Sequence, residues 1–259
     1  MVKKNIIKTL AIIQARMSST RLPGKVLLDL NGKTVLERVV ERVRRSELVD
    51  DVVIATTKER ADLKIVELAE AIGCKFHRGS TDDVLDRYFQ TARKFKPGHI
   101  VRITADCPLI DPKIIDLVVS RHLTVGADFT SNTIKLTYPD GLDIEVFTLK
   151  ALEISAKEAT LQSEREHLTQ FMRKNPERFR GENVYHHIDL SKKRWTLDNS
   201  EDYELIKKIY KSLHKEGEIF YMNEILDFLK ANPDFEKINS HIGANEGLIK
   251  SLKEDKRIR

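Results

Sequence analysis

A loop rich in cationic and hydroxyl side chains follows the first strongly apolar segment of the chain. The segment 10–15 is typical of a buried strand, and the loop 16–25 comes directly after it. Such a loop suits a polyphosphate, because backbone amides can form an anion-binding concavity while Arg16 and Lys25 neutralise charge. Its spacing matches neither G-x-x-x-x-G-K-[ST] nor G-x-G-x-x-G. We therefore expect a phosphate-binding loop of another type, with an ordinary basic surface loop as the alternative.

Two aspartates stand where an expected strand ends. Asp106 follows the expected strand 100–105, and Asp198 follows 195–197 and precedes an expected helix. A carboxylate at the mouth of a parallel sheet can hold Mg²⁺, which takes one or two carboxylates together with phosphate oxygens. Each aspartate also has a structural explanation: Asp106 could cap a loop, and Asp198 could cap a helix and stabilise it by ~1 kcal/mol. From the residues alone, the capping role of Asp106 is favoured.

Strands alternate with helices through the first half of the chain. The pattern predicts strands at 10–15, 52–56, 74–77 and 100–105, and helices at 34–45, 61–72, 82–94 and 112–121. This alternation implies βαβ units and a mostly parallel sheet covered on both faces. Ligands of such sheets bind beyond the carboxyl ends of the strands. The loops 16–25, 78–83 and 106–111 should therefore meet at the binding site.

The second half of the chain is less regular. The pattern there predicts short strands at 128–132, 143–147, 184–188 and 195–197, and a turn at 138–141. Expected helices cover 149–158, 163–174, 199–213 and 221–229.

Composition and charge exclude several classes of protein. The 259 residues are 41% hydrophobic and 33% charged, which is typical of a soluble globular chain with a full core. The net charge of +5 comes without a basic cluster interleaved with aromatics, so no nucleic acid partner is expected. Cys74 and Cys107 are too few for a disulfide framework or a cysteine-based zinc site. The apolar stretch 10–13 is too short to span a membrane, so we expect a cytoplasmic protein without a membrane partner.

The segment 11–25 resembles the signature of the sugar-activating cytidylyltransferases, the group that includes the KDO (3-deoxy-manno-octulosonate) and acylneuraminate enzymes. The chain is more similar to the SpsF-type proteins of spore coat polysaccharide synthesis. Further similar segments follow in order along the chain, at 78–87, 103–110, 138–146, 165–167, 195–198, 238–242 and 245–248. The resemblance implies an α/β nucleotide-diphospho-sugar transferase fold (Rossmann-like, GT-A type), a pyrophosphorylase-like reaction on CTP, and Mg²⁺ held by Asp106 and Asp198.

The resemblance also implies a division of roles among the residues. Arg16 and Lys25 are expected to take up charge on the leaving pyrophosphate. The expected nucleotide-binding residues are Gln14, Ala15, Arg16, Ser18, Ser19, Thr20, Arg21, Lys25, Arg78, Gly79 and Asp82. The expected acceptor-binding residues are Asn132, Tyr138, Asp140, Asp143, Glu145, Glu166 and His167.

Some of these residues have plain structural alternatives. Thr81 or Asp82 could cap the helix that begins nearby, which would leave the 78–83 loop without a role at the nucleobase. Asp143 and Glu145 share one face of an expected strand that could simply face solvent. His167 could be a buried histidine with satisfied hydrogen bonds.

The favoured function is nucleotidyl transfer from CTP to a sugar or sugar acid, with pyrophosphate release, for surface polysaccharide or glycan synthesis. The attacking group is a sugar hydroxyl or a sugar phosphate oxygen, so the product is a CMP- or a CDP-sugar. The alternatives are a glycosyltransferase on the same fold, which would use a nucleotide sugar, and a non-catalytic nucleotide-binding protein. The basic loop 16–25 favours the first of these functions, because it suits a free triphosphate.

We expect residues 1–215 to form the nucleotidyltransferase domain and residues 216–259 a helical C-terminal extension. Within the domain, residues 133–188 interrupt the βαβ pattern and should form a small inserted lobe. In the resembled enzymes the matching insert helps to bind the acceptor and pairs with a second subunit, so a homodimer is expected. The alternative is a monomer in which the insert covers its own sheet as a lid.

Overall fold

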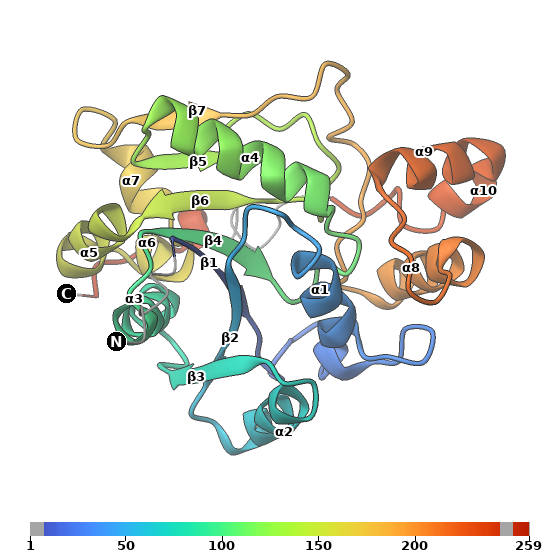
Figure 1. Ribbon diagram of the computed structural model, residues 1–259, viewed down its shortest axis with the longest axis horizontal. Helices are drawn as coiled ribbons and strands as arrows, with labels where there is room; N and C mark the ends of the chain where they lie inside the picture. Colours follow the sequence, from blue (N-terminus) through green and yellow to red (C-terminus); the bar gives the residue numbers. More distant parts are fainter. Residues whose placement is uncertain (1–7, 244–250, 259) are drawn as a thin grey trace, which may run out of the picture.

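A seven-stranded sheet in the order β3-β2-β1-β4-β6-β5-β7 forms the centre of the computed structural model, which describes residues 8–243 and 251–258 (Figure 1). The strands β1 (Thr9–Gln14), β2 (Asp51–Thr57), β3 (Lys75–Gly79) and β4 (His99–Thr104) are parallel to one another. Strand β6 (Glu145–Thr148) is antiparallel to both β4 and β5 (Phe129–Ser131), and β7 (Gly181–Asn183) pairs with β5 in parallel. The predicted mostly parallel α/β fold is confirmed.

Helices cover both faces of the sheet, as the continuous apolar strands require. One face packs against α1 (Val35–Val43), α2 (Leu63–Ala71), α4 (Pro112–Val125), α8 (Ser200–Leu213) and α9 (Met222–Ala231). The opposite face packs against α3 (Val84–Phe95), α5 (Leu149–Glu158) and α7 (Gln170–Lys174). The central strands are buried from both sides, and residues 10–13 of β1 have no exposed surface.

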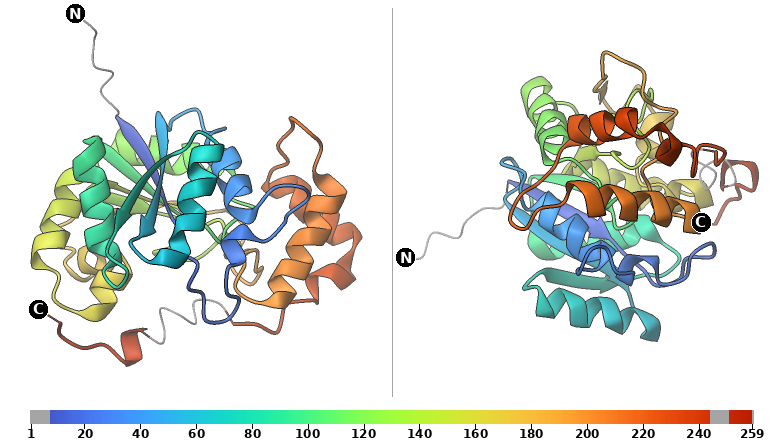
Figure 2. Two further views of the ribbon diagram at one scale, coloured as in Figure 1. Left: turned by 90° about the horizontal axis from the view of Figure 1, so that it is seen from below. Right: turned by 90° about the vertical axis from the view of Figure 1, so that its right-hand side faces the viewer.

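Short helices complete the connections. The 3₁₀ turns η1 (Lys25–Leu27) and η2 (Arg60–Asp62) precede α1 and α2, and α6 (Gln162–Glu166) lies between α5 and α7. At the other end of the molecule α10 (Pro233–Glu236) follows α9, and both lie beside α8 (Figure 2). No helix in the described part of the chain is long and apolar enough to cross a membrane.

Several expected elements differ in the structure. No strand forms at 184–188 as expected. The strand lies a few residues earlier, at β7, because residues 181–183 pair with residues 129–131. The expected strand 195–197 is absent, and Arg194 makes only an isolated bridge with Asp140. The helix expected at 163–174 is broken into α6 and α7, because His167 has an extended backbone. Helix α3 starts at Val84, and its N-cap is Asp83 rather than Thr81 or Asp82.

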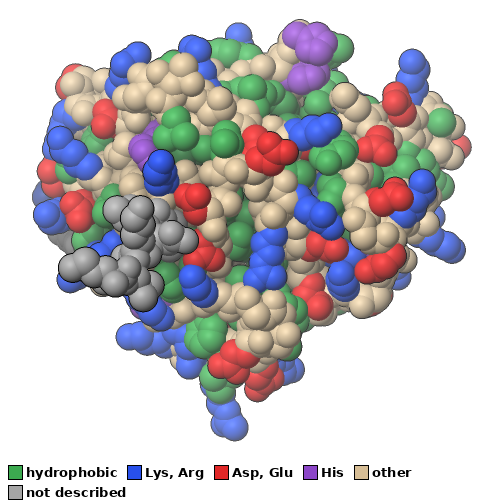
Figure 3. Space-filling view, in the orientation of Figure 1, with side chains coloured by type: hydrophobic (Ala, Val, Ile, Leu, Met, Phe, Trp, Pro, Cys, Tyr) green, Lys and Arg blue, Asp and Glu red, His purple; other side chains and the backbone are tan. Residues whose placement is uncertain are grey.

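Charges are mixed over the surface that Figure 3 shows, where acidic and basic side chains alternate. The segment 133–188 contains β6 and β7, and both strands pair within the central sheet. This segment therefore supplies β6, which lies next to β4, and the edge strand β7. The carboxyl end of β4 leads to Asp106.

Candidate active site

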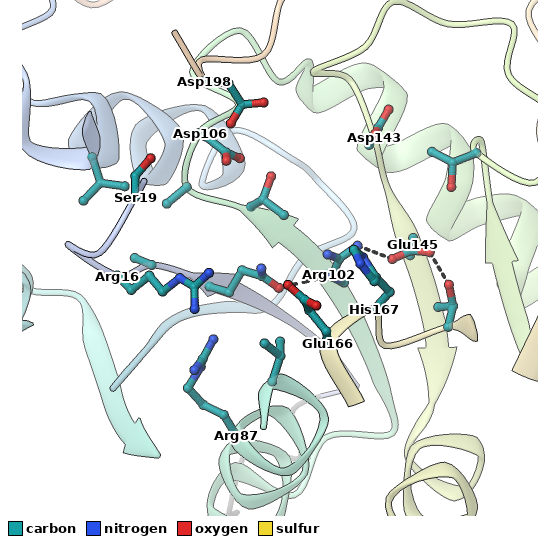
Figure 4. A pocket seen from close by; sticks show the side chains of 18 of the residues that line it. Arg16, Ser19, Arg87, Arg102, Asp106, Asp143, Glu145, Glu166, His167 and Asp198 are labelled. Atoms are coloured by element: carbon teal, nitrogen blue, oxygen red, sulfur yellow. Dashed lines mark hydrogen bonds and ion pairs between the residues drawn. The ribbon is translucent and has the colours of Figure 1, made fainter. Parts of the chain in front are cut away.

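A cavity of about 420 Å³ opens at the carboxyl ends of β1 and β4, the sheet edge at which the sequence predicts a ligand (Figure 4). Its wall has two halves. The loop after β1, the end of β4 and Asp198 form one half, which we call the nucleotide half. Residues of β6, α6 and α7 form the opposite half, which we call the acceptor half.

The basic loop contributes every residue that was expected of it. The cavity wall includes Gln14, Ala15, Arg16, Ser18, Ser19, Thr20, Arg21 and Lys25. The loop turns tightly, since the amides of both Ser19 and Gly24 donate to the carbonyl of Met17 at 3.0 Å. Gly24 has a φ of 71°, a left-handed conformation that favours glycine, and it starts the 3₁₀ turn that directs Lys25 inward.

Lys25 joins the two aspartates of the nucleotide half. Its Nζ donates to Asp106 Oδ2 at 2.7 Å and to Asp198 Oδ1 at 2.8 Å. Burial lowers the pKa of Lys25, but the two carboxylates outweigh burial and raise it overall. Burial likewise raises the pKa of Asp106, but the Lys25 ammonium reverses this effect and brings it to about 2. The structure thus brings both expected metal ligands to a single cation.

This pair of carboxylates fits a magnesium ion that also binds a nucleotide. Mg²⁺ usually takes one or two carboxylates and completes its shell with phosphate oxygens and water. The described residues include no cluster of three or more His, Cys, Asp or Glu side chains that could hold a metal without a substrate. A second anchor fixes the two ligand-bearing segments, because the amide of Leu197 donates to the Asp106 carbonyl at 2.8 Å.

The acceptor half is organised around one buried carboxylate, Glu145. It forms ion pairs with Arg102 and Arg173, and it accepts a hydrogen bond from Thr169. Burial raises the pKa of Glu145, but the two guanidinium groups outweigh burial and bring it to about 2. Both guanidinium groups line the cavity, so Glu145 holds two cations in fixed positions on its wall.

Asp143 lies on the cavity wall without such partners. No described residue donates a hydrogen bond to its carboxyl group, and Figure 4 shows Asp143 across the cavity from Asp106. Burial raises its pKa to about 8, and the negative charges of Asp140 and Glu145 add to this effect. His167 also lines the cavity, and burial lowers its pKa. Its Nε2 is buried and makes no hydrogen bond to a described residue.

Six expected site residues lie outside the cavity wall. Arg78 donates to the Thr57 and Glu59 carbonyls, and the side chain of Asn132 bridges the backbone at 142 and 144. Asp140 pairs with Arg194 at 3.1 Å. The full set outside the wall is Arg78, Gly79, Asp82, Asn132, Tyr138 and Asp140.

The cavity also contains residues that sequence reasoning missed. These are Val26, Val84, Arg87, Arg102, Thr104, Ala105, Thr133, Leu136, Thr169, Gln170 and Arg173. Arg102 could have been recognised in the sequence as a candidate site residue, because it is a charged residue inside an apolar strand. Arg87 lies in the family-like segment 78–87, but its place at the cavity depends on Gly79, at which a Cβ would lie 2.8 Å from Arg87 Cγ.

Comparison with known proteins gives a consistent set of relatives. The family model described as "Cytidylyltransferase" matches residues 10–237. The chain is 35% identical over 232 residues to the spore coat polysaccharide biosynthesis protein SpsF of Bacillus subtilis, covering 87% of this chain and 95% of that protein. It is 33% identical over 114 residues to the 3-deoxy-manno-octulosonate cytidylyltransferase of Chloroherpeton thalassium, covering 43% of this chain and 45% of that protein. The solved structure of a cytidylyltransferase from Leptospira borgpetersenii matches with a TM-score of 0.84 and 38% identity, covering 88% of this chain and 96% of that one.

Proposed function

This chain belongs to the cytidylyltransferase family, and we propose that it transfers the CMP unit of CTP to a hydroxyl of a sugar or sugar acid with release of pyrophosphate. The observation that carries this proposal is the convergence of Asp106 and Asp198 on Lys25, at the base of a basic loop. A nucleotidyltransferase needs such a point, at which cations and carboxylates meet the phosphates of the nucleotide.

The nucleotide half supplies positioning and charge. Arg16, Arg21 and Lys25 line the cavity and are the groups proposed to bind the triphosphate. When the acceptor oxygen forms a bond to the α-phosphorus, the bond to the bridging β-phosphate oxygen breaks and negative charge grows on pyrophosphate. Fixed cations stabilise this charge without reorganising. The hydroxyl proton leaves to solvent.

Magnesium belongs to the same proposal, with Asp106 and Asp198 as its protein ligands. When bound there, the ion would neutralise phosphate charge and orient the α-phosphate. Arg21 and Arg194 each pair with Asp198, at 2.9 and 3.1 Å. These two ion pairs keep that carboxylate in place independently of Lys25.

The acceptor half is proposed to hold the sugar. Asp143, Glu145, Glu166 and His167 all line it and offer hydrogen-bonding groups to a polyhydroxylated ligand. A sugar acid is the favoured class, because the Chloroherpeton relative is named for transfer to 3-deoxy-manno-octulosonate. A role in polysaccharide synthesis is supported by the name of the Bacillus relative.

The direct test is pyrophosphate release. The protein is mixed with CTP, Mg²⁺ and one acceptor at a time, including 3-deoxy-manno-octulosonate, N-acetylneuraminate and neutral hexoses. Release that requires all three components supports the proposal. UTP, ATP and GTP serve as matched controls for the nucleotide. Pyrophosphate formation with none of the acceptors, or equal rates with all four nucleotides, would contradict it.

A homodimer through residues 133–188 is also part of the proposal. Large apolar side chains of this segment are exposed in the single chain, among them Ile134, Tyr185 and Ile188, the last two by more than half. Closed two-fold pairing would cover them. Sedimentation at micromolar concentration should give twice the mass of 29.8 kDa. A mass of one chain would contradict the dimer, and these residues would then form a lid or an uncovered edge. The cytoplasmic location stays a prediction of the sequence.

A further inference from the structure

Residues 251–258, which we call the C-terminal strap, lie along the helix that ends at Glu166. Figure 2 shows the strap in dark red beside the segment that contains α5 and α6. The amide of Ile258 donates to the Thr160 carbonyl at 2.9 Å, and Arg257 forms an antiparallel bridge with Leu161. We infer that the C-terminal strap is a positioning element of the acceptor half, which holds α6 and orients Glu166 at its end.

The first argument is that the first amides of α6 have no side-chain acceptor of their own, since Glu164 of α6 accepts instead from the preceding amides of Thr160 and Leu161. The helix has five residues and its N-cap is Leu161, whose side chain has no oxygen to accept from the first free amides. The strap supplies these acceptors from about ninety residues away. The Lys256 carbonyl accepts from the Gln162 amide at 2.9 Å. Asp255 accepts from the Ser163 amide at 2.9 Å and from the Ser163 hydroxyl at 2.6 Å.

The cap matters because so short a helix is not stable alone. Isolated helices need about twelve residues before their hydrogen bonds offset the cost of nucleation. Asp255 also lies 3.7 Å from Lys174 of α7. The strap therefore contacts both helices of the acceptor half, at the start of α6 and at the end of α7.

The second argument is a direct contact with a cavity residue. The Ser251 hydroxyl donates to Glu166 Oε2 at 2.7 Å. Glu166 lines the cavity, so this bond restricts the carboxylate while its other oxygen stays available to a ligand hydroxyl. His167 follows directly, with its buried Nε2 lacking a partner among the described residues. The strap thus orders two neighbouring groups that, under the proposed function, face the sugar.

A second set of contacts also holds α6, and the test must distinguish it from the strap. Arg165 is almost fully buried and donates to Asp83 at 2.9 Å and to the Ala156 carbonyl at 2.8 Å. If these bonds alone fix α6, variants of the strap should change nothing at the cavity.

The first experiment follows the helix itself by hydrogen–deuterium exchange of the full-length protein. Asp255→Ala should speed exchange of the 162–166 amides about fivefold or more, because it removes a helix cap. The matched control is Asp234→Ala, since Asp234 is exposed on α10 and pairs with the exposed Lys237. Equal exchange in the two variants would overturn the inference.

The second experiment separates acceptor binding from CTP binding. With 3-deoxy-manno-octulosonate as the acceptor, Ser251→Ala should raise the acceptor KM at least threefold, leave the KM for CTP unchanged, and be rescued by Ser251→Thr. Ser240→Ala, at an exposed serine outside the strap, is the control. An equal rise in the KM for CTP would contradict the role in the acceptor half. If wild-type protein releases no pyrophosphate, the proposed function fails and the exchange experiment alone decides about the strap.

Discussion

The two halves of the cavity are built in different ways. The nucleotide half comes mainly from one continuous loop, and its charged groups converge on Lys25 between Asp106 and Asp198. The acceptor half comes from separate elements, and its charges are already paired around Glu145.

The difference predicts different consequences of mutation. In the nucleotide half, cations and carboxylates are arranged for phosphates that arrive with the substrate, so substitutions should act mainly on the reaction. In the acceptor half, Arg102 and Arg173 are already paired with the buried Glu145, so substitutions in this network should act first on folding. The predictions below test this contrast, from the largest expected effect to the smallest.

Asp106→Asn should have the largest effect. It removes one of two carboxylates proposed to bind Mg²⁺, and kcat for pyrophosphate release should fall about a thousandfold. The melting temperature should fall less than in a variant of the more deeply buried Glu145, because the Asp106 side chain is 27% exposed and Lys25 keeps its ion pair with Asp198. Asp51→Asn, at a surface pair with Lys75 away from the cavity, is the control and should keep full activity. Activity within tenfold of wild type would remove Asp106 from the metal site.

Glu145→Gln should chiefly lower stability. It leaves Arg102 and Arg173 without their carboxylate in a largely buried setting, which should cost ~3 kcal/mol of unfolding free energy. The pH dependence has the same origin, since the folded pKa of about 2 lies below the ordinary value of 4.5. The stabilisation is therefore fully present above pH 4.5 and is lost as the pH falls toward 2.

Urea unfolding of wild type and Glu145→Gln at pH 7 and at pH 3 measures both effects. The difference between the two proteins should shrink at the lower pH. Glu158→Gln removes an exposed ion pair with Arg178 and should leave the unfolding midpoint unchanged. An equally small effect of Glu145→Gln would show that the ion pairs of Glu145 do not stabilise the fold.

The same contrast explains what could be predicted from the sequence. All eight residues from Gln14 to Lys25 that were assigned to the nucleotide lie on the cavity wall, because the end of a buried strand fixes where the short loop after it begins. Asp106 and Asp198 could be paired only through the family resemblance, since 92 residues separate them. Arg173 was missed because its role depends on Glu145, and no local pattern reveals a contact between α7 and β6.

The secondary structure shows a similar limit. The helix at 149–158 and the strand at 10–15 follow from periodicity and were predicted almost to the residue. The break between α6 and α7 was missed, since both segments have helix-forming sequences and the break depends on packing around His167. The C-terminal strap could not have been found, because Asp255 caps a helix far away in the chain.

Lys25→Ala also tests whether substitutions in the nucleotide half act mainly on the reaction. Its expected effect is smaller than that of Asp106→Asn. Lys25 is assigned to charge that grows on pyrophosphate, so kcat should fall about a hundredfold while the acceptor KM changes little. Steady-state kinetics with varied CTP checks this, and Lys33→Ala on the surface serves as the control. Near-normal kcat with only a raised KM for CTP would make Lys25 a residue that binds ground state and transition state equally.

Asp143→Asn should give the smallest effect, and it should be a gain in stability. The folded pKa of Asp143 is raised to about 8, well above the ordinary value of 3.8. Between these values the unfolded chain carries the charge while the folded protein holds the proton, so wild-type stability falls as the pH rises from about 4 to 8. Asparagine stands in for the protonated carboxyl group and lacks this cost.

Because water reaches the cavity, the gain at pH 8 should be only ~1 kcal/mol, and it should vanish near pH 4. Melting curves of both proteins across this range measure the difference. Equal stability at pH 8 would mean that the charged form of Asp143 is solvated, and that the acceptor half is more open than its paired network indicates.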